Sequence, residues 1–343
     1  MKKINSLLII ILISFINMQS FAQTPTLTVR ELPSLNLKKF LPPGSYSGIT
    51  HISENTYAVV SDDNSRDGFF KIKIIIDESS GEILSVENIG YYSSQTSNRD
   101  AECITYNKRR QTLYIGGEKN NSIVEYDLSG KATGVRSGNL FPDSRNNLGM
   151  ESLCYDSVND RLWSVTESTQ KSDNDGNYAT ATNGLSNMLR LTCFDTNFNK
   201  IEEYAYLMDN PESKNKGKLH VMGVSDICML DNERLLILER EAYIPKLRFG
   251  AWSNCKLYIV NPSQSEPIKD SKPLSSSTKF IFKTLLWSCK TQMSFSGLNW
   301  ANYEGICLGP KLQDGSQTIL LISDSQNHYK GVLQDWIKVL VIK

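Results

Sequence analysis

Acidic residues recur where short apolar stretches begin in this chain. Four stretches share such a start: "RDAECITYN", "GMESLCYDS", "GVSDICMLD" and "NYEGICLGP". Their recurring acids are Glu102, Glu151, Asp226 and Glu304, and a fifth, degenerate copy, "YSGITHISE", has Ser47 in the acidic position. An internal repeat of this kind predicts a fold built from copies of one unit. Carboxylates at equivalent places of such units would gather together, where their oxygens suit a hard cation such as calcium.

A second set of acids follows the first. After each repeated stretch come a turn and another apolar stretch that ends in an acid, and these closing acids are Asp62, Glu118, Glu167, Glu239 and Asp324. A third apolar stretch follows in every unit and a fourth in most of them. Short runs rich in Val, Ile, Tyr and Leu, separated by Gly, Asn, Asp and Ser, are typical of β-strands. The chain is therefore expected to be all-β.

Five units of four strands predict a single β-propeller of five blades. The fifth unit ends before a fourth strand, and "TLTVREL" near the N-terminus is expected to supply that strand and close the ring. Six blades remain an alternative if one long interval hides a further unit. The longest insertion, "STQKSDNDGNYATATNGLSN", lies between the second and third strands of the third unit. Because no linker separates the units, we expect one domain over residues 23–343.

Propeller geometry predicts where both sets of acids lie. The first strand of a blade is innermost and the second runs antiparallel beside it, so the start of the first and the end of the second share one face. Carboxylates crowded at this end of the central channel would repel one another, which raises their pKa values, and a bound cation would relieve the repulsion. The expected calcium ligands are Ser47, Glu102, Glu151, Asp226 and Glu304.

The first residues indicate export. Residues 1–22 combine a basic start, the apolar core "SLLIIILISFI" and the small residues of "SFA", as a secretory signal peptide does. The apolar core is short for a membrane span, so no stable membrane insertion is expected. A secreted or periplasmic location follows.

Without Lys2 and Lys3 the chain is slightly acidic, which argues against a nucleic-acid partner. We expect a monomer.

Other chemistries lack their motifs. The seven cysteines form no CxxC pair, so a thiolate zinc site is not expected, and the odd count leaves at least one thiol unpaired. Buried apolar packing is the favoured interpretation of the cysteines over a disulfide framework. No GxSxG, HExxH or P-loop motif occurs.

Taken together, "SGITHI…VVSDD", "DAECITY", "MESLCYD…LWSVTES", "SDICML…LLILERE" and "YEGICLG…LLISDS" resemble the phytase-like family, also described as having esterase-like activity of phytase. The resemblance covers nearly the whole mature chain. It implies that the recurring acids form the active centre, and Ser47 departs from an all-acidic ring. The layout is also similar to that of calcium-activated nucleotidases (apyrases), which are five-bladed propellers with central calcium.

The resemblance implies a calcium-dependent phosphoric ester hydrolase acting on a small phosphorylated substrate. Arg99 and Arg240 are the candidate phosphate-binding cations, because each lies near an acid of the repeat. Glu239 or Asp324 would serve as general base. The alternative is a non-enzymatic propeller that binds a ligand or partner and uses calcium only for stability, because fold alone does not decide function.

Overall fold

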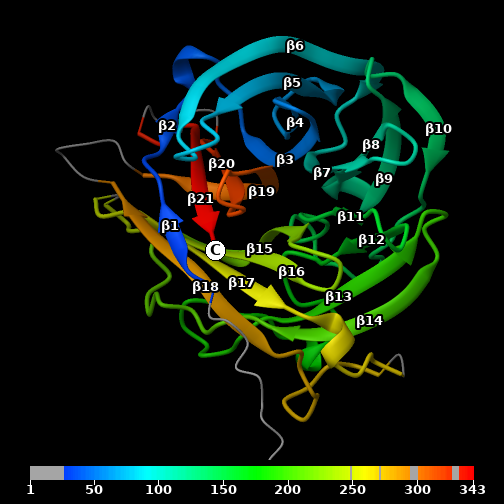
Figure 1. The fold of residues 1–343 in the computed structure, drawn as a ribbon. Coiled ribbons are helices and arrows are strands. Elements are labelled where there is room, and N and C mark those ends of the chain that lie inside the picture. Colours follow the sequence, from blue (N-terminus) through cyan, green and yellow to red (C-terminus); the bar gives the residue numbers. More distant parts are fainter. Residues whose placement is uncertain (1–26, 248, 270–271, 294–299, 327–331) are drawn as a thin grey trace, which may run out of the picture.

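The computed structural model describes residues 27–343 except 248, 270–271, 294–299 and 327–331 (Figure 1). The expected signal peptide lies outside these residues. No helix within the described part of the chain is long and apolar enough to cross a membrane.

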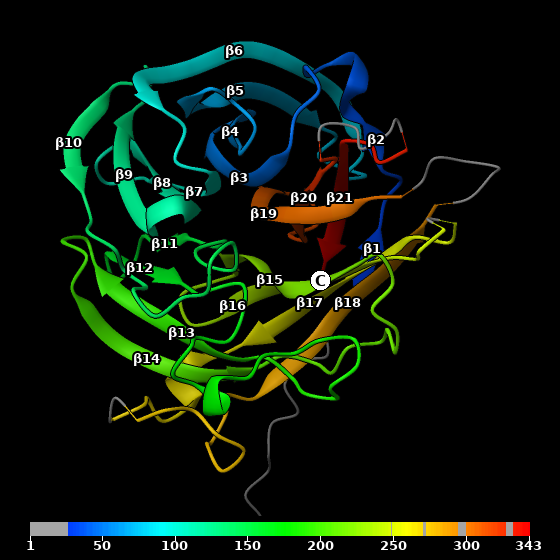
Figure 2. The same ribbon diagram turned by 180° about the vertical axis from the view of Figure 1, so that it is seen from behind.

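Five antiparallel sheets stand around a central axis (Figures 1 and 2). The first blade is β3 (Tyr46–Ser53), β4 (Thr56–Ser61), β5 (Arg66–Ile76) and β6 (Ile83–Ser97). The second is β7 (Ala101–Asn107), β8 (Thr112–Gly117), β9 (Ser122–Asp127) and β10 (Ala132–Arg136). The third is β11 (Cys154–Asp156), β12 (Arg161–Ser164), β13 (Met188–Asp195) and β14 (Lys200–Leu207). The fourth is β15 (Leu219–Met229), β16 (Leu235–Ile244), β17 (Trp252–Val260) and β18 (Lys283–Gln292).

The fifth blade joins the two ends of the chain. It contains β19 (Asn302–Lys311), β20 (Gln317–Asp324) and β21 (Trp336–Ile342), with β1 (Val29–Glu31) as outer strand and β2 (Leu35–Asn36) also paired to β21. Val29 lies opposite Ile342, and the Glu31 carboxylate binds Lys338 of β21 and accepts a hydrogen bond of 2.8 Å from Trp287 Nε1 of β18. The expected closure by an N-terminal strand is confirmed, and the ring has five blades rather than six.

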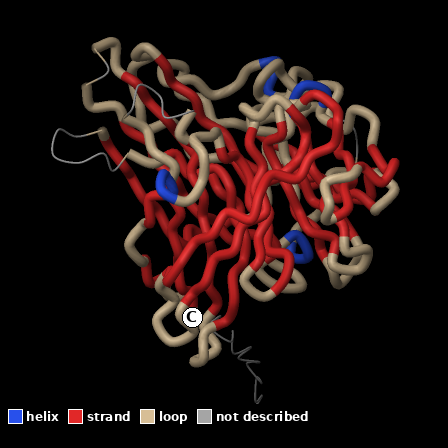
Figure 3. The backbone as a smooth tube through the Cα atoms, turned by 90° about the horizontal axis from the view of Figure 1, so that it is seen from above, coloured by secondary structure: helices blue, strands red, loops and turns tan. Residues whose placement is uncertain are grey.

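Most of the described backbone is strand, and the few helical turns are short 3₁₀ segments (Figure 3). The first strand of each blade is innermost, and its apolar residues, such as Ile49, Ile104 and Ile306, are buried between blades. All seven cysteines are free, and most of them are buried, as expected of small apolar side chains.

Two elements of the fourth blade differ from the sequence pattern. The hairpin of β15 and β16 is longer than the repeat, with Leu219 paired to Ile244, so it extends past the point where the other inner hairpins end. The outer strand β18 starts only at Lys283. The segment before it crosses to the third blade, where the N–H of Ile281 donates to the carbonyl of Ala205 at 2.8 Å.

The long insertion of the third blade is held by one buried arginine. Arg190 of β13 donates to both carboxylate oxygens of Asp173 at 2.8 and 2.7 Å, and to Glu203 of β14 at 2.7 Å. Asp173 lies within the insertion, and both it and Arg190 are buried. The ion pair therefore fixes the insertion to the blade.

We expect Arg190→Met to destabilise the fold by about 3–5 kcal/mol, because it leaves the buried carboxylate of Asp173 without a cation and leaves Glu203 with only the exposed Lys200 at 3.3 Å. Arg161→Met is the matched control: Arg161 lies 3.9 Å from Glu202 and both side chains are 36% exposed, so the loss should be below about 1 kcal/mol. Urea denaturation followed by circular dichroism measures both. Equal losses in the two variants would contradict the structural role of Arg190.

Candidate active site

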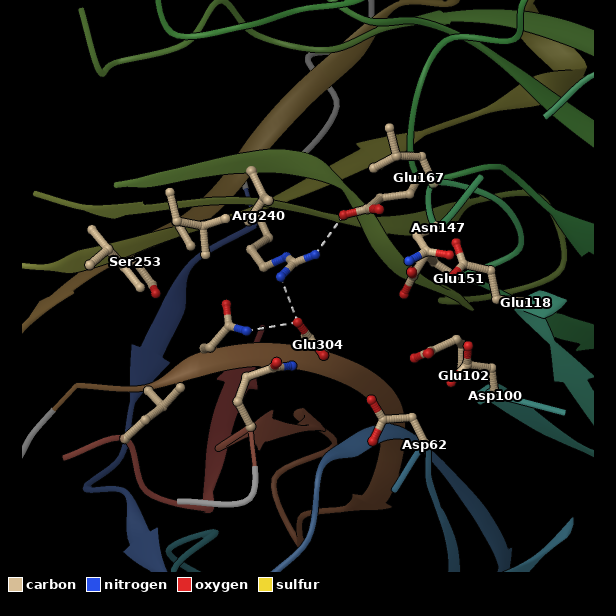
Figure 4. Close-up of a pocket in the computed structure, with 18 of the residues that line it drawn as sticks. Asp62, Asp100, Glu102, Glu118, Asn147, Glu151, Glu167, Arg240, Ser253 and Glu304 are labelled. Atoms are coloured by element: carbon tan, nitrogen blue, oxygen red, sulfur yellow. Dashed lines mark hydrogen bonds and ion pairs between the residues drawn. The ribbon is translucent and has the colours of Figure 1, made fainter. Parts of the chain in front are cut away.

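The structure contains a pocket of about 560 Å³ that is rich in acidic side chains (Figure 4). Its acidic lining residues are Asp62, Asp100, Glu102, Glu118, Glu151, Glu167 and Glu304. Asp62 and Glu118 directly follow the second strands β4 and β8, and Glu167 comes three residues after β12. Glu102 and Glu304 lie near the starts of the first strands β7 and β19, and Glu151 comes three residues before β11. The fold thus brings most of the acids of the repeat together in one pocket.

A repeated β-bulge aims the inner residues at the pocket. In β7, Ala101 pairs with Gly117 and Cys103 pairs with Gly116, so Glu102 is the extra residue. The same irregularity falls on Ser47, Ser225 and Glu304 in three other blades. A bulge leaves one residue outside the regular pairing and redirects its side chain.

This register corrects the expected place of Asp226. Ser225, two residues before the buried Ile227, is the equivalent of Glu102, and Asp226 is one residue further along the strand. Its carboxylate accepts the backbone N–H of Ile227 at 2.8 Å and that of Ile306 at 2.9 Å. Asp226 thus ties β15 to β19, and it is not among the described residues that line the pocket.

Arg240 lies between two of the pocket acids. Its Nη2 is 2.6 Å from Glu167 Oε1 and its Nη1 is 2.7 Å from Glu304 Oε1 (Figure 4). Gly223 lies opposite Arg240 in the β-ladder, and a Cβ at Gly223 would stand 2.1 Å from Glu167 Cγ, so a glycine is needed for this approach. Burial raises the pKa values of Glu167 and Glu304, and the guanidinium of Arg240 opposes that shift.

The remaining acids have no ion-pair partner among the described residues. Candidate ligand atoms of Asp62, Asp100 and Glu102 lie within 4.8 Å of one another, and so do those of Glu102, Glu118 and Glu151. Glu102 therefore belongs to both groups.

The pKa values of these acids are raised above their ordinary values, as expected for carboxylates buried close together. Burial, followed by repulsion from Asp324, raises the pKa of Asp62 to about 7. Burial also raises the pKa of Glu118 to about 7, although a hydrogen bond from the Gly149 N–H opposes the shift. The pKa of Glu102 is raised well above its usual range by burial and by the charges of Asp62 and Glu304.

Two oxygens at this cluster have no hydrogen-bond partner among the described residues: the buried Ser47 Oγ and Asp62 Oδ1. Ser47 lies close enough to Glu102 for its hydroxyl to lower the pKa of that carboxyl. Buried oxygens without donors beside crowded carboxylates are a donor set that fits a calcium ion.

The other sequence candidates have different surroundings. Asp324 is fully buried at the end of β20, where it accepts the N–H of Gln326 at 2.6 Å, and Gln326 lines the pocket. Glu239 faces away from Arg240, its neighbour on β16, and binds Tyr206 Oη at 2.6 Å and Lys283 Nζ at 2.5 Å.

Arg99 also lies away from the pocket. Its guanidinium donates to Asp67 of β5 at 2.6 Å, to the Ser122 carbonyl at 2.7 Å and to the Ile115 carbonyl at 3.1 Å. These contacts tie the first blade to the second. Neither Arg99 nor Glu239 is therefore positioned with the acids of the pocket.

Several lining residues were not expected from the sequence: Asp100, Asn147, Lys218, Trp300 and Gln326. Asp100 directly precedes β7 and has a positive φ of 63°, so strand alternation gives no signal for it. Lys218 reaches the pocket only because the β15–β16 hairpin is longer than the repeat predicts.

Several solved structures match the chain at low identity. A streptogramin B lyase structure is 14% identical over 92% of this chain and 98% of its own, with a TM-score of 0.37. A calcium structure of a Trichoderma reesei carbohydrate-active enzyme of family AA12 is 11% identical over 93% and 96%, with a TM-score of 0.40. A member of the DUF4221 family from Bacteroides vulgatus is 9% identical over 93% and 99%, with a TM-score of 0.38. Such low scores imply nothing about chemistry.

No curated protein matches the sequence significantly. A family model does match, over residues 42–326, which run from just before β3 to just after β20. Since this match covers most of the chain and all the acids of the pocket, the chain belongs to the phytase-like family, described as having esterase-like activity of phytase.

Proposed function

We propose that this protein is an exported, calcium-dependent phosphoric ester hydrolase that acts at the mouth of the propeller channel. One observation carries the proposal: two groups of carboxylates that share Glu102 lie in the same pocket as a buried arginine. Membership of the phytase-like family supports hydrolysis.

The proposed cation ligands are Asp62, Asp100, Glu102, Glu118 and Glu151, with the Ser47 hydroxyl as a neutral donor. Calcium binds several carboxylate and hydroxyl oxygens at once, as this set offers. When bound, it supplies positive charge that offsets the phosphate oxygens of a substrate. Glu304, another expected ligand, is instead paired with Arg240.

The chain's own residues would orient the substrate and move a proton. Arg240 is held by Glu167 and Glu304, while its buried Nε has no partner among the described residues. The exposed Lys218 at the pocket rim provides a further positive charge for a phosphate group. We assign the general base to Asp324, which accepts a hydrogen bond from the pocket residue Gln326, rather than to Glu239, which is bound to Tyr206 and Lys283.

The proposal includes secretion or periplasmic export through residues 1–22, a small phosphorylated substrate, a monomeric protein, and no nucleic-acid or membrane partner. A panel of phytate, nucleotides and simple alkyl and aryl phosphates, each with calcium and with chelator, tests it. Turnover that requires calcium is the expected result. Absence of turnover on every phosphoester with calcium present would leave a ligand-binding propeller with structural calcium.

Stability should depend on both pH and calcium. The folded-state pKa values of Asp62 and Glu118, about 7, exceed their ordinary values of 3.8 and 4.5. Their contribution to stability is therefore present below about pH 4 and is lost as pH rises through about 7 in the absence of calcium. Because calcium binds the ionised carboxylates, the rise in melting temperature on adding calcium should be larger at pH 8 than at pH 5.

Differential scanning fluorimetry at the two pH values measures this effect. Glu102→Gln should reduce the calcium shift more than Asp100→Asn or Glu118→Gln, since Glu102 belongs to both carboxylate groups. Glu78→Gln, at an exposed position in the β5–β6 turn, is the control and should leave the shift unchanged. A calcium shift that is absent, or equal at both pH values, would contradict the cation site.

The assignment of the base predicts different results for two buried acids. Asp324→Asn should lower kcat by about 10²–10⁴-fold while the calcium shift in melting temperature persists. Glu239→Gln should lower stability, because it breaks the buried contacts to Tyr206 and Lys283, yet leave kcat within about threefold. Steady-state kinetics with calcium measures both. Similar losses of kcat in the two variants would contradict the assignment of the general base to Asp324 rather than to Glu239.

A further inference from the structure

The pocket has two chemically different sides. Asp62, Asp100, Glu102 and Glu118 lie on one side of the Arg240–Glu304 pair, and Ser253 lies on the other (Figure 4). About half of the described lining residues beyond the acids are apolar: Leu148, Leu219, Val221, Ala242, Ile244, Trp300 and Leu333.

The apolar side is formed by side chains that the fold holds in place. Leu219 and Val221 come from β15 and Ala242 and Ile244 from β16, in the part of the hairpin that exceeds the repeat. Ile244, Trp300 and Leu333 belong to one buried cluster, and the Trp300 ring is fixed by a hydrogen bond of 2.9 Å from its Nε1 to Ser253 Oγ. Leu219 is 46% exposed and Val221 is half-buried, so both have apolar area to offer a ligand.

Positive charge is scarce in the same pocket. Among the described lining residues, the basic side chains are Lys218 and Arg240, and Arg240 already has two carboxylate partners. A substrate with many phosphates would bring several negative charges into the pocket. The cation site would offset only one or two of these charges. A substrate with one phosphate and an apolar group would match both sides.

We propose that the substrate is a phosphate ester of an apolar alcohol, with the phosphate at the carboxylate-bound cation. The alcohol would lie against the apolar wall, which is formed by Leu219 and Val221 of β15 and Ala242 and Ile244 of β16. This inference rests on the proposed hydrolase function. In the reaction a water oxygen forms a bond to phosphorus, the bond from phosphorus to the alcohol oxygen breaks, and one water proton leaves to the base. The released alcohol takes up a proton, so an alcohol and inorganic phosphate result.

A series of n-alkyl phosphates tests the proposal, because ethyl, butyl and hexyl phosphate have leaving groups of nearly equal acidity. With calcium present, kcat/KM should rise about two- to fourfold per added methylene until the apolar wall is covered, as expected for apolar burial. Hexyl phosphate should also be cleaved faster than phytate. Turnover without chain-length dependence, or faster cleavage of phytate, overturns the proposal but leaves the hydrolase function intact.

Two variants test whether the apolar wall causes the chain-length dependence of kcat/KM. Leu219→Gln combined with Val221→Gln should abolish the chain-length dependence, so that hexyl phosphate is cleaved no faster than ethyl phosphate. Leu285→Gln is the matched control, since Leu285 is 51% exposed on the outer strand β18 and lies outside the pocket lining. An unchanged chain-length dependence in the double variant would overturn the assignment of the wall.

Binding can be measured without turnover. Hexylphosphonate, which has no ester bond to cleave, should bind more tightly than ethylphosphonate in isothermal titration calorimetry with calcium, and the double variant should lose that difference. If no phosphoester is hydrolysed but this difference is found, the hydrolase function fails while the apolar ligand site stands. Equal affinity for the two phosphonates overturns the site itself.

Discussion

The main physical constraint on this structure is the cost of burying several carboxylates together in one pocket. Burial makes each charge costly, and each neighbour adds repulsion. Arg240 relieves part of this cost by pairing with both Glu167 and Glu304. The acids around Glu102 receive no such relief from the described residues, and their raised pKa values record that imbalance. A cation is the physical complement that this side of the pocket needs.

The five-bladed architecture could be predicted from the sequence because the repeat is carried by backbone-determined features: strand length, turns and apolar alternation. Closure by the N-terminal strand followed from the missing fourth strand of the last unit, and β1 lies where that deficit required. Glu102, Glu151 and Glu304 converge as expected, since equivalent strand starts must meet in a ring. The longer β15–β16 hairpin could not be read from the repeat, because its added residues, which pair Leu219 with Ile244, have no counterpart in the other units.

The errors in the site come from one-residue effects. A bulge shifts the register of each inner strand, so Ser225 rather than Asp226 is the equivalent of Glu102, and the spacing to Ile227 was the available signal. Adjacent strand residues face opposite ways, which separates Glu239 from Arg240 although both follow the same apolar run. Arg99 precedes Glu102 by three residues, yet the turn between them directs its guanidinium to Asp67. Sequence proximity to an acid did not indicate the orientation of these side chains.

The central claim is that the carboxylates around Glu102 hold a cation. Anomalous diffraction from crystals grown with calcium and then exchanged into terbium tests it most directly, because terbium occupies oxygen-rich calcium sites and scatters strongly. The account predicts an anomalous peak beside Glu102, within about 2.3–2.6 Å of its carboxylate and of oxygens from Asp62 and Asp100 or from Glu118 and Glu151. Unliganded carboxylates at that position, with terbium bound elsewhere or not at all, would contradict the account.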